Sequence, residues 1–271
     1  MNESRDILQY LHYHPLSSRG DITAGTAFKG SDATLKRMIA AGIKAGDIVA
    51  EGKARATRYR LSPQAQLLMP LNLDTYFALE VDERQVQSSY NFELINGLLA
   101  ETRLFSDKEQ VHLDALQEEF RQHISELTDN EYRKEMERLG IDLSWKSSQI
   151  EGNTYTLLET ERLLRESKTA EGKSKEEAVM LLNHKDALSF VLDNPDYLKE
   201  LTVSHIEDIH QLLTKDLSID KGLRRHRVGI TGTNYHPLDN EFQIREAMRD
   251  ACELINSKSN IFEKALLTLV L

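Results

Sequence analysis

Apolar residues recur at helical spacing through most of the chain between residues 106 and 217, and this pattern limits the fold more than any other feature of the sequence. It predicts helices over residues 106–126, 131–150, 157–166, 174–193 and 203–217. The clear break is Gly222 to Pro237, where residues 227–235 predict a short β-hairpin. We therefore expect a mainly α fold that a single hairpin interrupts in this part of the chain.

The composition is that of a globular protein. The chain has 271 residues, of which 40% are hydrophobic and 29% charged. No apolar run approaches the roughly 20 residues that a bilayer-spanning helix needs, and the N-terminal sequence MNESRDILQY is too polar for a signal peptide. The single cysteine, Cys252, excludes an intrachain disulfide and a cysteine zinc cluster. We expect a cytoplasmic protein without a membrane partner.

Charge is distributed unevenly along the chain. Residues 1–61 contain ten Lys and Arg against six Asp and Glu, a net charge of +4, whereas the remainder carries −14. A basic unit on an acidic body is typical of a protein in which only the basic unit contacts nucleic acid. Ordinary scatter produces a difference of this size as well, so the charge count leaves both readings open.

The basic N-terminal part has a recognisable pattern of elements. Apolar spacing from Ile7 to Leu11 predicts a helix that ends at His14-Pro15, because a residue before proline avoids the helical region. A second short helix is expected from Ser18 to Ala27, a third beginning after an N-cap at Ser31, and two strands at 48–49 and 57–61 joined by residues 51–55. Three helices and a basic hairpin resemble a winged helix-turn-helix unit.

Such a unit has a candidate nucleic-acid face on its third helix and its wing. The cations on these two elements are Lys36, Arg37 and Lys44 on the helix and Lys53, Arg55, Arg58 and Arg60 on the wing. Winged helices also dock onto proteins, so DNA and protein partners both remain open. Ser62 to Leu73, with Pro63 and Pro70, predicts a linker after this unit.

Several standard catalytic and metal sites are absent from the sequence. There is no HExxH, GxSxG or GxGxxG motif, and His205 and His210 are five residues apart, which is not zinc-ligand spacing on a helix. Residues 171–174 have the tail of a phosphate loop, but Ser167 occupies the position of its first glycine. We therefore expect no metal ligands of these classes.

The segment from Ser147 to Thr154 predicts the end of one helix and the start of another. Gly152 can adopt the left-handed conformation that terminates a helix, and Thr156 with Glu159 forms a capping box for the next one. Glu151 then lies at a helix C-terminus, where the macrodipole disfavours a carboxylate by about 0.3–1 kcal/mol. Either a cation such as arginine pairs with Glu151, or water screens an exposed glutamate.

This segment resembles a known family. Ser147-x-x-x-Glu151-Gly152-Asn153 is similar to the inhibitory motif S/T-x-x-x-E-G/N of Fic-domain proteins, and the sequence through Glu159 is similar to members whose inhibitory helix precedes the core. Further matches follow in the family's order, at Gly172–Glu177, Leu201–His210, Gly222–Arg224 and Val228–Pro237. The resemblance covers about residues 80–271.

The resemblance implies a helical Fic-type core with a short β-hairpin flap, preceded by the small winged helix-turn-helix domain. The implied divisions are a winged-helix domain at 1–62, a linker at 63–79, a helical segment leading to the inhibitory helix at 80–150 and the core at 151–271. Fic proteins transfer AMP from ATP, with Mg²⁺, to a Ser, Thr or Tyr hydroxyl of a target protein.

Roles carry over only to matching residues. Glu151 would be the inhibitory glutamate, within the motif residues Ser147, Gly152 and Asn153. It would pair with an arginine of the catalytic loop and keep the γ-phosphate of ATP from its productive position. The flap residues implied to lie at the nucleotide, together with Glu151, are Ile230, Thr231, Gly232 and Thr233. Arg224 and Arg225 are expected to be structural, and a homodimer is left open.

The family's catalytic loop, H-P-F-x-x-G-N-G-R-x-x-R, does not occur in these 271 residues. The sequence ends in the apolar run Leu266–Leu271, which resembles the helix that leads into that loop. We expect a truncation at this point, no catalytic residue in the printed chain and no transferase activity from it. The alternative is a non-catalytic regulatory module that binds DNA or protein on a Fic scaffold.

Overall fold

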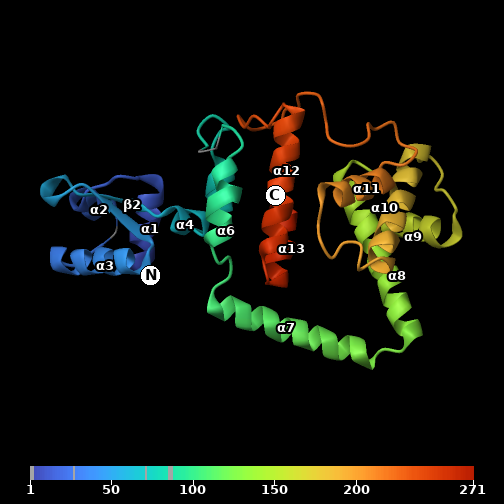
Figure 1. Ribbon diagram of the computed structural model, residues 1–271, viewed down its shortest axis with the longest axis horizontal. Coiled ribbons are helices and arrows are strands. Elements are labelled where there is room, and N and C mark those ends of the chain that lie inside the picture. Colours follow the sequence, from blue (N-terminus) through green and yellow to red (C-terminus); the bar gives the residue numbers. More distant parts are fainter. Residues whose placement is uncertain (1–2, 27, 71, 85–87) are drawn as a thin grey trace. The chain divides into compact units, whose positions relative to one another are not determined.

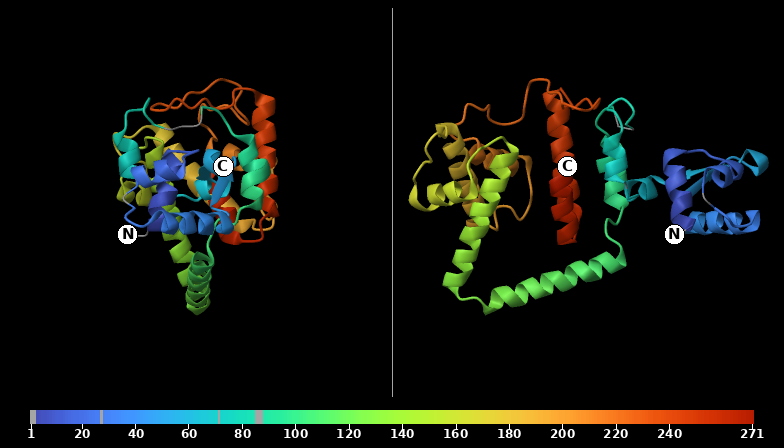
Figure 2. Two further views of the ribbon diagram at one scale, coloured as in Figure 1. Left: turned by 90° about the vertical axis from the view of Figure 1, so that its left-hand side faces the viewer. Right: turned by 180° about the vertical axis from the view of Figure 1, so that it is seen from behind.

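The computed structural model describes residues 3–26, 28–70, 72–84 and 88–271, and most of these residues are helical (Figure 1). The mainly α prediction is therefore confirmed. The chain divides into two compact units, one formed by residues 1–86, 97–104 and 232–234 and the other by the rest. Figure 2 gives two further views of the elements.

The first unit begins with three helices and an antiparallel pair of strands, in the order that the sequence predicts. The elements are α1 (Glu3–Tyr13), α2 (Arg19–Gly25), α3 (Asp32–Ala45), β1 (Ile48–Glu51) and β2 (Arg58–Leu61). Ile48 pairs with Leu61 and Glu51 with Arg58, and a single 3₁₀ turn, Ala54–Ala56, lies between the strands. Ala27, the last residue of the predicted second helix, lies outside the described residues.

Local signals explain where these helices begin and end. The Ser18 and Ser31 hydroxyls accept hydrogen bonds from the backbone N–H groups of Asp21 and Thr34, so each serine satisfies a donor that its helix leaves free. Gly46 ends α3 in the left-handed conformation, with φ 86°. The winged-helix identity of this unit stays a prediction.

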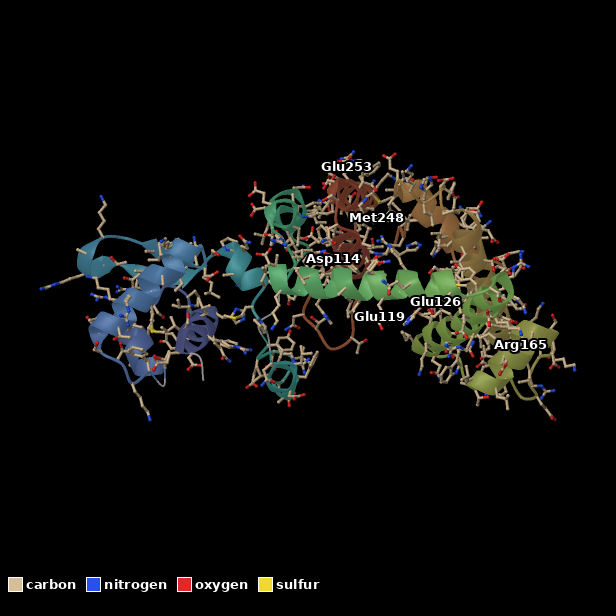
Figure 3. The ribbon with its side chains drawn as sticks, turned by 90° about the horizontal axis from the view of Figure 1, so that it is seen from below. Asp114, Glu119, Glu126, Arg165, Met248 and Glu253 are labelled. Carbon is tan, nitrogen blue, oxygen red and sulfur yellow. The ribbon has the colours of Figure 1, made fainter. Side chains whose placement is uncertain are left out.

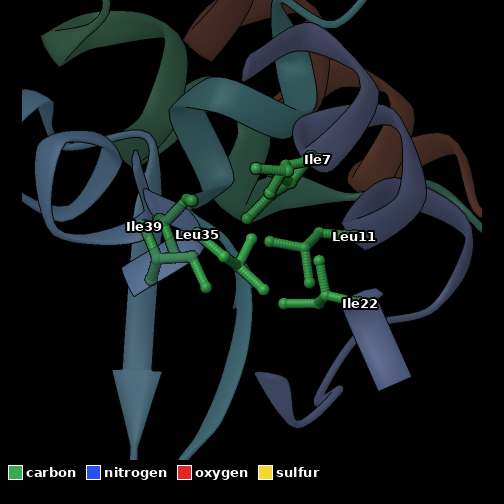
Figure 4. Packing of buried hydrophobic residues seen from close by; sticks show 7 residues of the cluster. Ile7, Leu11, Ile22, Leu35 and Ile39 are labelled. Carbon is green, nitrogen blue, oxygen red and sulfur yellow. The ribbon is translucent and has the colours of Figure 1, made fainter. Parts of the chain in front are cut away.

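The apolar residues of the three helices meet in one cluster (Figure 4). Each of its members exposes 4% or less of its surface, so the cluster is a true core. Its members are Ile7, Leu11, Ile22, Leu35, Ile39, Ile48 and Leu61.

Short helices follow where the sequence predicts a linker. In α4 (Pro63–Leu67) the Ser62 hydroxyl caps the helix and Pro63 occupies its first turn, where a missing N–H costs nothing. Next come α5 (Leu73–Ala78), a π-helical turn at Leu94–Leu98 and α6 (Leu99–Glu101). The proline that marked a loop in the sequence therefore begins a helix.

The second unit contains the long helices. The five predicted spans correspond, with small shifts, to α7 (Asp107–Glu126), α8 (Asp129–Ile150), α9 (Leu157–Glu166), α10 (Lys175–Asp193) and α11 (Val203–Leu213). Two further helices follow, α12 (Glu241–Ser257) and α13 (Ile261–Val270). Capping boxes begin α7, α8, α9 and α10. The helix predicted to reach residue 217 ends at Leu213, and Asp216 beyond it has a left-handed φ of 58°.

Helices α8, α9 and α10 pack around a common core. Its buried residues come from each helix and from the turn between α8 and α9, and they expose 6% or less of their surfaces. They are Ile141, Tyr155, Leu163, Leu164, Ala178 and Leu181. This core holds the turn that carries Glu151 between two rigid helices.

Helix α7, on which Figure 3 labels Asp114, Glu119 and Glu126, has no buried residue, in contrast to α6 and α8. Val111, Leu116 and Phe120 are 70%, 47% and 55% exposed. The Asn260 side chain, which caps α13, hydrogen-bonds that of Gln110 near the start of α7. Within the described ranges, no helix has the length and apolar character needed to cross a membrane.

The predicted β-hairpin at residues 227–235 is wrong. This segment is irregular among the described residues, and the nearest pairing is an isolated parallel bridge between Ser89 and His236. A tight hairpin of the commonest type needs a positive φ at both central residues. Gly232 has a φ of 81°, but the β-branched Thr231 does not adopt a positive value. Val228 and Ile230 are also 48% and 53% exposed, so strand pairing here would bury little apolar surface.

Candidate regulatory site

The turn between α8 and α9 has the geometry that its sequence predicts. Glu151 is the C-cap residue of α8, with φ −85° and ψ 9°, and Gly152 follows in the left-handed conformation with φ 87°. The N–H groups of Glu151 and Gly152 donate to the carbonyls of Ser148 and Gln149. A Cβ on Gly152 would meet no atom within 4 Å, so glycine is needed here for its backbone conformation rather than for space.

The Glu151 side chain is exposed, and no cation of the described residues lies within ion-pair distance of it. Its electrostatic effect reaches His184 on α10. Burial lowers the pKa of His184, and the negative charge of Glu151 opposes this shift by favouring the protonated ring. The arginine partner expected from the sequence is therefore not among the described residues, and Glu151 presents a solvated carboxylate.

Two buried serines lie on α8 just before this turn. Ser144 and Ser148 are 2% and 0% exposed, and within the described structure neither hydroxyl has a hydrogen-bond partner. An unpaired buried hydroxyl costs about 1–3 kcal/mol. Ser147, the motif residue, is half-buried. The burial of Ser148 was not predicted from the sequence, although its spacing of four residues from Ser144 places both serines on one helix face.

Asn153 and Tyr155 attach the turn to its surroundings. The Asn153 amide donates to the carbonyl of Glu177 at 2.8 Å and accepts from the N–H of Tyr155 at 3.0 Å. Tyr155 is 1% exposed, and its carbonyl accepts from the Trp145 indole at 3.0 Å. The Tyr155 hydroxyl accepts from the N–H of Ala170 at 3.3 Å. Both residues are thus fixed in the α8–α10 core.

Thr154 lies between them and is held by two charged residues. Glu177 accepts from the Thr154 N–H at 2.7 Å and from its hydroxyl at 2.6 Å. Lys173 donates to the Thr154 carbonyl at 2.6 Å and to its hydroxyl oxygen at 3.0 Å. Hydrogen bonds from the Thr154 hydroxyl, then from the backbone N–H of Ser174 and of Thr154, lower the pKa of Glu177 to about 2. We call Thr154, Lys173 and Glu177 the Thr154 clamp.

The structure does not join the flap residues to Glu151. Among the described residues, no hydrogen bond or ion pair links Glu151 to Ile230 or Thr231. Gly232 and Thr233 belong to the other compact unit. The nucleotide-binding role of Glu151 with these four residues stays a prediction.

The three arginines at positions 224, 225 and 227 make structural contacts. Arg224 donates to the carbonyls of His226 and Leu238. Arg225 lies 3.5 Å from Glu241 and Arg227 lies 2.6 Å from Asp239. These contacts agree with the structural role expected of Arg224 and Arg225, because they tie residues 224–227 to the chain around the start of α12.

The cations of the first unit divide into two groups. Arg60 pairs with Glu51 at 2.5 Å and Arg19 with Asp32 at 3.3 Å. In contrast, no carboxylate of the described residues lies within ion-pair distance of the exposed side chains of Lys36, Arg37, Lys53 and Arg55. Arg58 donates to the carbonyl of Thr57. The exposed cations of the candidate nucleic-acid face that have no ion pair among the described residues are therefore Lys36, Arg37, Lys44, Lys53, Arg55 and Arg58, whereas Arg60 is paired with Glu51.

The described residues include no group of three or more His, Cys, Asp and Glu side chains that could hold a metal ion. The backbone nest, histidine and arginines that the family resemblance implies belong to a loop that the 271 residues do not contain. No protein-family model, curated protein or solved structure matches the chain.

Proposed function

We propose that residues 80–271 are the regulatory part of a Fic-type protein adenylyltransferase and that Glu151 inhibits the transfer of AMP to a target hydroxyl. The observation that carries the proposal is the state of Glu151. Its carboxylate is solvent-exposed at the end of α8, without a cation among the described residues, while its backbone is hydrogen-bonded. The order of the matching motifs along the chain supports the same function.

Inhibition works through charge competition in this proposal. A carboxylate at a helix C-terminus is disfavoured by the helix dipole, so an arginine beside it is attracted strongly. An arginine that pairs with Glu151 is not free to bind a nucleotide phosphate. The arginine and the other reacting groups are absent from these residues, and we therefore derive no catalytic step from them. The activity is proposed for a form of the protein that also carries the loop.

The test compares variants of the full-length gene product. Glu151→Gly should increase self-labelling by ATP that carries the label on its α-phosphate, because the phosphate-binding arginine loses its competitor. Glu171→Gln, which removes an exposed glutamate twenty residues away, is the matched control. Equal labelling of the parent and Glu151→Gly proteins, with both folded, would reject the inhibitory role.

The intact mass of the protein distinguishes the enzyme from the alternative, a non-catalytic module, and it can be measured before any activity is tested. The intact mass of the protein from its native source should lie clearly above 31.0 kDa if the loop is present. A mass of 31.0 kDa would remove the enzyme proposal and leave a binding module. The proposed location in either case is the cytoplasm.

A second candidate function is DNA binding by the first unit. The exposed side of α3 combines three small residues with three cations, and its opposite side is the core (Figure 4). Small side chains allow a phosphate backbone to approach closely, and unneutralised cations attract it. The six residues are Ala33, Ala40, Ala41, Lys36, Arg37 and Lys44.

Binding to labelled duplex DNA, measured by anisotropy at several salt concentrations, tests this function. Lys36→Gln together with Arg37→Gln should weaken binding and reduce the slope of log affinity against log salt by about 2, because each phosphate contact contributes about 0.9. Arg5→Gln, an exposed cation on α1, is the control. Undetectable binding by the parent protein at low salt would favour a protein partner instead.

A further inference from the structure

Glu151 lies between two points at which the chain is fixed. On one side, the last hydrogen bonds of α8 hold the N–H groups of residues 151–153, and the N–H of Asn153 donates to the carbonyl of Ser148 at 3.0 Å. On the other side is the Thr154 clamp, three residues later. The chain between these points is short and includes Gly152, the residue with the widest conformational freedom. The position of the backbone that carries the Glu151 side chain therefore depends on both points.

The clamp is built from α10 rather than from the turn itself. One oxygen of the Glu177 carboxylate accepts from the N–H of Ser174, which completes the capping box of α10. The other oxygen accepts both hydrogen bonds from Thr154. A single carboxylate thus joins the start of α10 to the turn after α8. Hydrogen bonds to a charged acceptor are stronger than neutral ones.

Lys173 completes the clamp from the same end of α10. Its side chain is 19% exposed, and its ammonium group lies 4.0 Å from Glu159 in addition to its two bonds to Thr154. The ammonium group also lies 5.9 Å from the centre of the Tyr155 ring. All hydrogen-bonding groups of Thr154 therefore face charged side chains, and the turn cannot shift without breaking several bonds.

We propose that Glu177 is a positioning residue for Glu151: by holding Thr154, it fixes where the inhibitory carboxylate lies. The inhibitory meaning rests on the proposed function, whereas the positioning itself concerns the turn alone. In this arrangement the backbone that carries Glu151 is held in place, and moving it requires the turn to leave α10.

Two nuclear magnetic resonance readouts on the 271-residue protein test the positioning. The first is hydrogen exchange at the Thr154 amide, which donates directly to Glu177. The second is the pKa of His184, which Glu151 raises from its burial-lowered value. The variant Glu151→Gln serves as a reference, because it shows how far the pKa of His184 falls when the nearby negative charge is removed completely.

Glu177→Gln and Thr154→Val both weaken the clamp, and the second leaves the α10 capping box intact. In each variant, we expect hydrogen exchange of the backbone amide at position 154 to be at least about tenfold faster, as the loss of a charged hydrogen bond predicts. We also expect the pKa of His184 to fall toward its value in Glu151→Gln, because the carboxylate moves away.

Three variants serve as matched controls. Glu176→Gln removes the neighbouring charge, Ser174→Ala breaks the capping box without removing a bond to Thr154, and Thr154→Ser keeps the hydroxyl. All three should retain the parent His184 pKa and the parent Thr154 exchange rate. If the changes came from a general loosening of α10, Ser174→Ala would alter the amide exchange rate and the His184 pKa in the same way as Glu177→Gln.

The proposal is overturned if either clamp variant leaves the exchange rate or the His184 pKa at the parent value. It is also overturned if Ser174→Ala reproduces both changes. These readouts do not depend on AMP transfer. A failure of Glu151→Gly to increase labelling would therefore reject the inhibitory function and leave the positioning by Glu177 standing.

Discussion

The turn after α8 and the segment at 227–235 both carry residues that the family resemblance places at a nucleotide, but their local structures differ. In the turn, Asn153, Thr154 and Tyr155 are joined to α8 and α10 by side-chain hydrogen bonds. In the segment at 227–235, the predicted strands do not pair. The difference shows that side-chain bonds to neighbouring helices define a turn more firmly than a two-strand pattern defines a hairpin.

The largest effect should come from the core beneath the turn. Leu181→Ala should lower the free energy of unfolding by about 2–5 kcal/mol, because Leu181 is 0% exposed between α8 and α9. Ile230→Ala, in the irregular segment, should change it by less than about 0.5 kcal/mol. Urea unfolding followed by helical circular dichroism measures both. Equal losses would mean that residues 227–235 are packed as firmly as the turn.

Alanine at the two left-handed glycines sharpens the comparison. Gly152 and Gly232 have φ values of 87° and 81°, and a Cβ at either position would meet no atom within 4 Å. Gly152→Ala should cost about 1–2 kcal/mol of unfolding free energy, since the surrounding bonds prevent relaxation. Gly232→Ala should cost less, because residues around it form no regular helix or strand and can adjust. A larger loss at Gly232, measured by the same urea unfolding, would reverse the comparison.

Acid should loosen the turn selectively. Hydrogen bonds from Thr154 and from the N–H of Ser174 hold the pKa of Glu177 at about 2, below its ordinary value of 4.5. A depressed pKa gives stability that is fully present above pH 4.5 and lost as the pH falls toward 2. Amide protection at residues 153–155 should therefore decrease over that range. In Glu177→Gln this part of the pH dependence should be absent, and its persistence would assign the effect to another carboxylate.

The smallest effect is expected for a surface ion pair. Arg227 is 87% exposed beside Asp239, whereas Lys173 is 19% exposed against Thr154. Arg227→Met should cost less than about 1 kcal/mol of unfolding free energy, and high salt should remove the loss. Lys173→Met should cost more and depend less on salt, because its bonds are shielded from solvent. Unfolding at low and high salt distinguishes the two variants.

Features governed by neighbouring residues could be predicted from the sequence. Ser31, Gly46, Gly152 and the Thr156–Glu159 pair marked helix ends, and each end lies where its residues indicate. The same reasoning placed Glu151 at the end of α8 but left open whether a cation pairs with it or water screens it; it is exposed and has no ion pair among the described residues. These signals act within a few residues, and the structure around them does not need to be known.

Features governed by distant residues could not be predicted. The bonds of Thr154 to Lys173 and Glu177 join residues 19 and 23 positions apart, and no periodicity announces them. The only signals were the polar pair Asn153-Thr154 between two predicted helices and Glu177 near the start of a third. The hairpin failed for the related reason that strand pairing depends on a buried face, which Val228 and Ile230 do not have.

The lack of buried residues in helix α7 has a consequence for local unfolding and proteolysis. A helix of 20 residues that fully buries none of them draws most of its stability from its own backbone bonds, its capping box and its salt-sensitive side-chain pairs, which are marginal in water. We expect α7 to open locally while the α8–α10 core stays folded, so that a protease at low concentration first cuts the chain within residues 107–126.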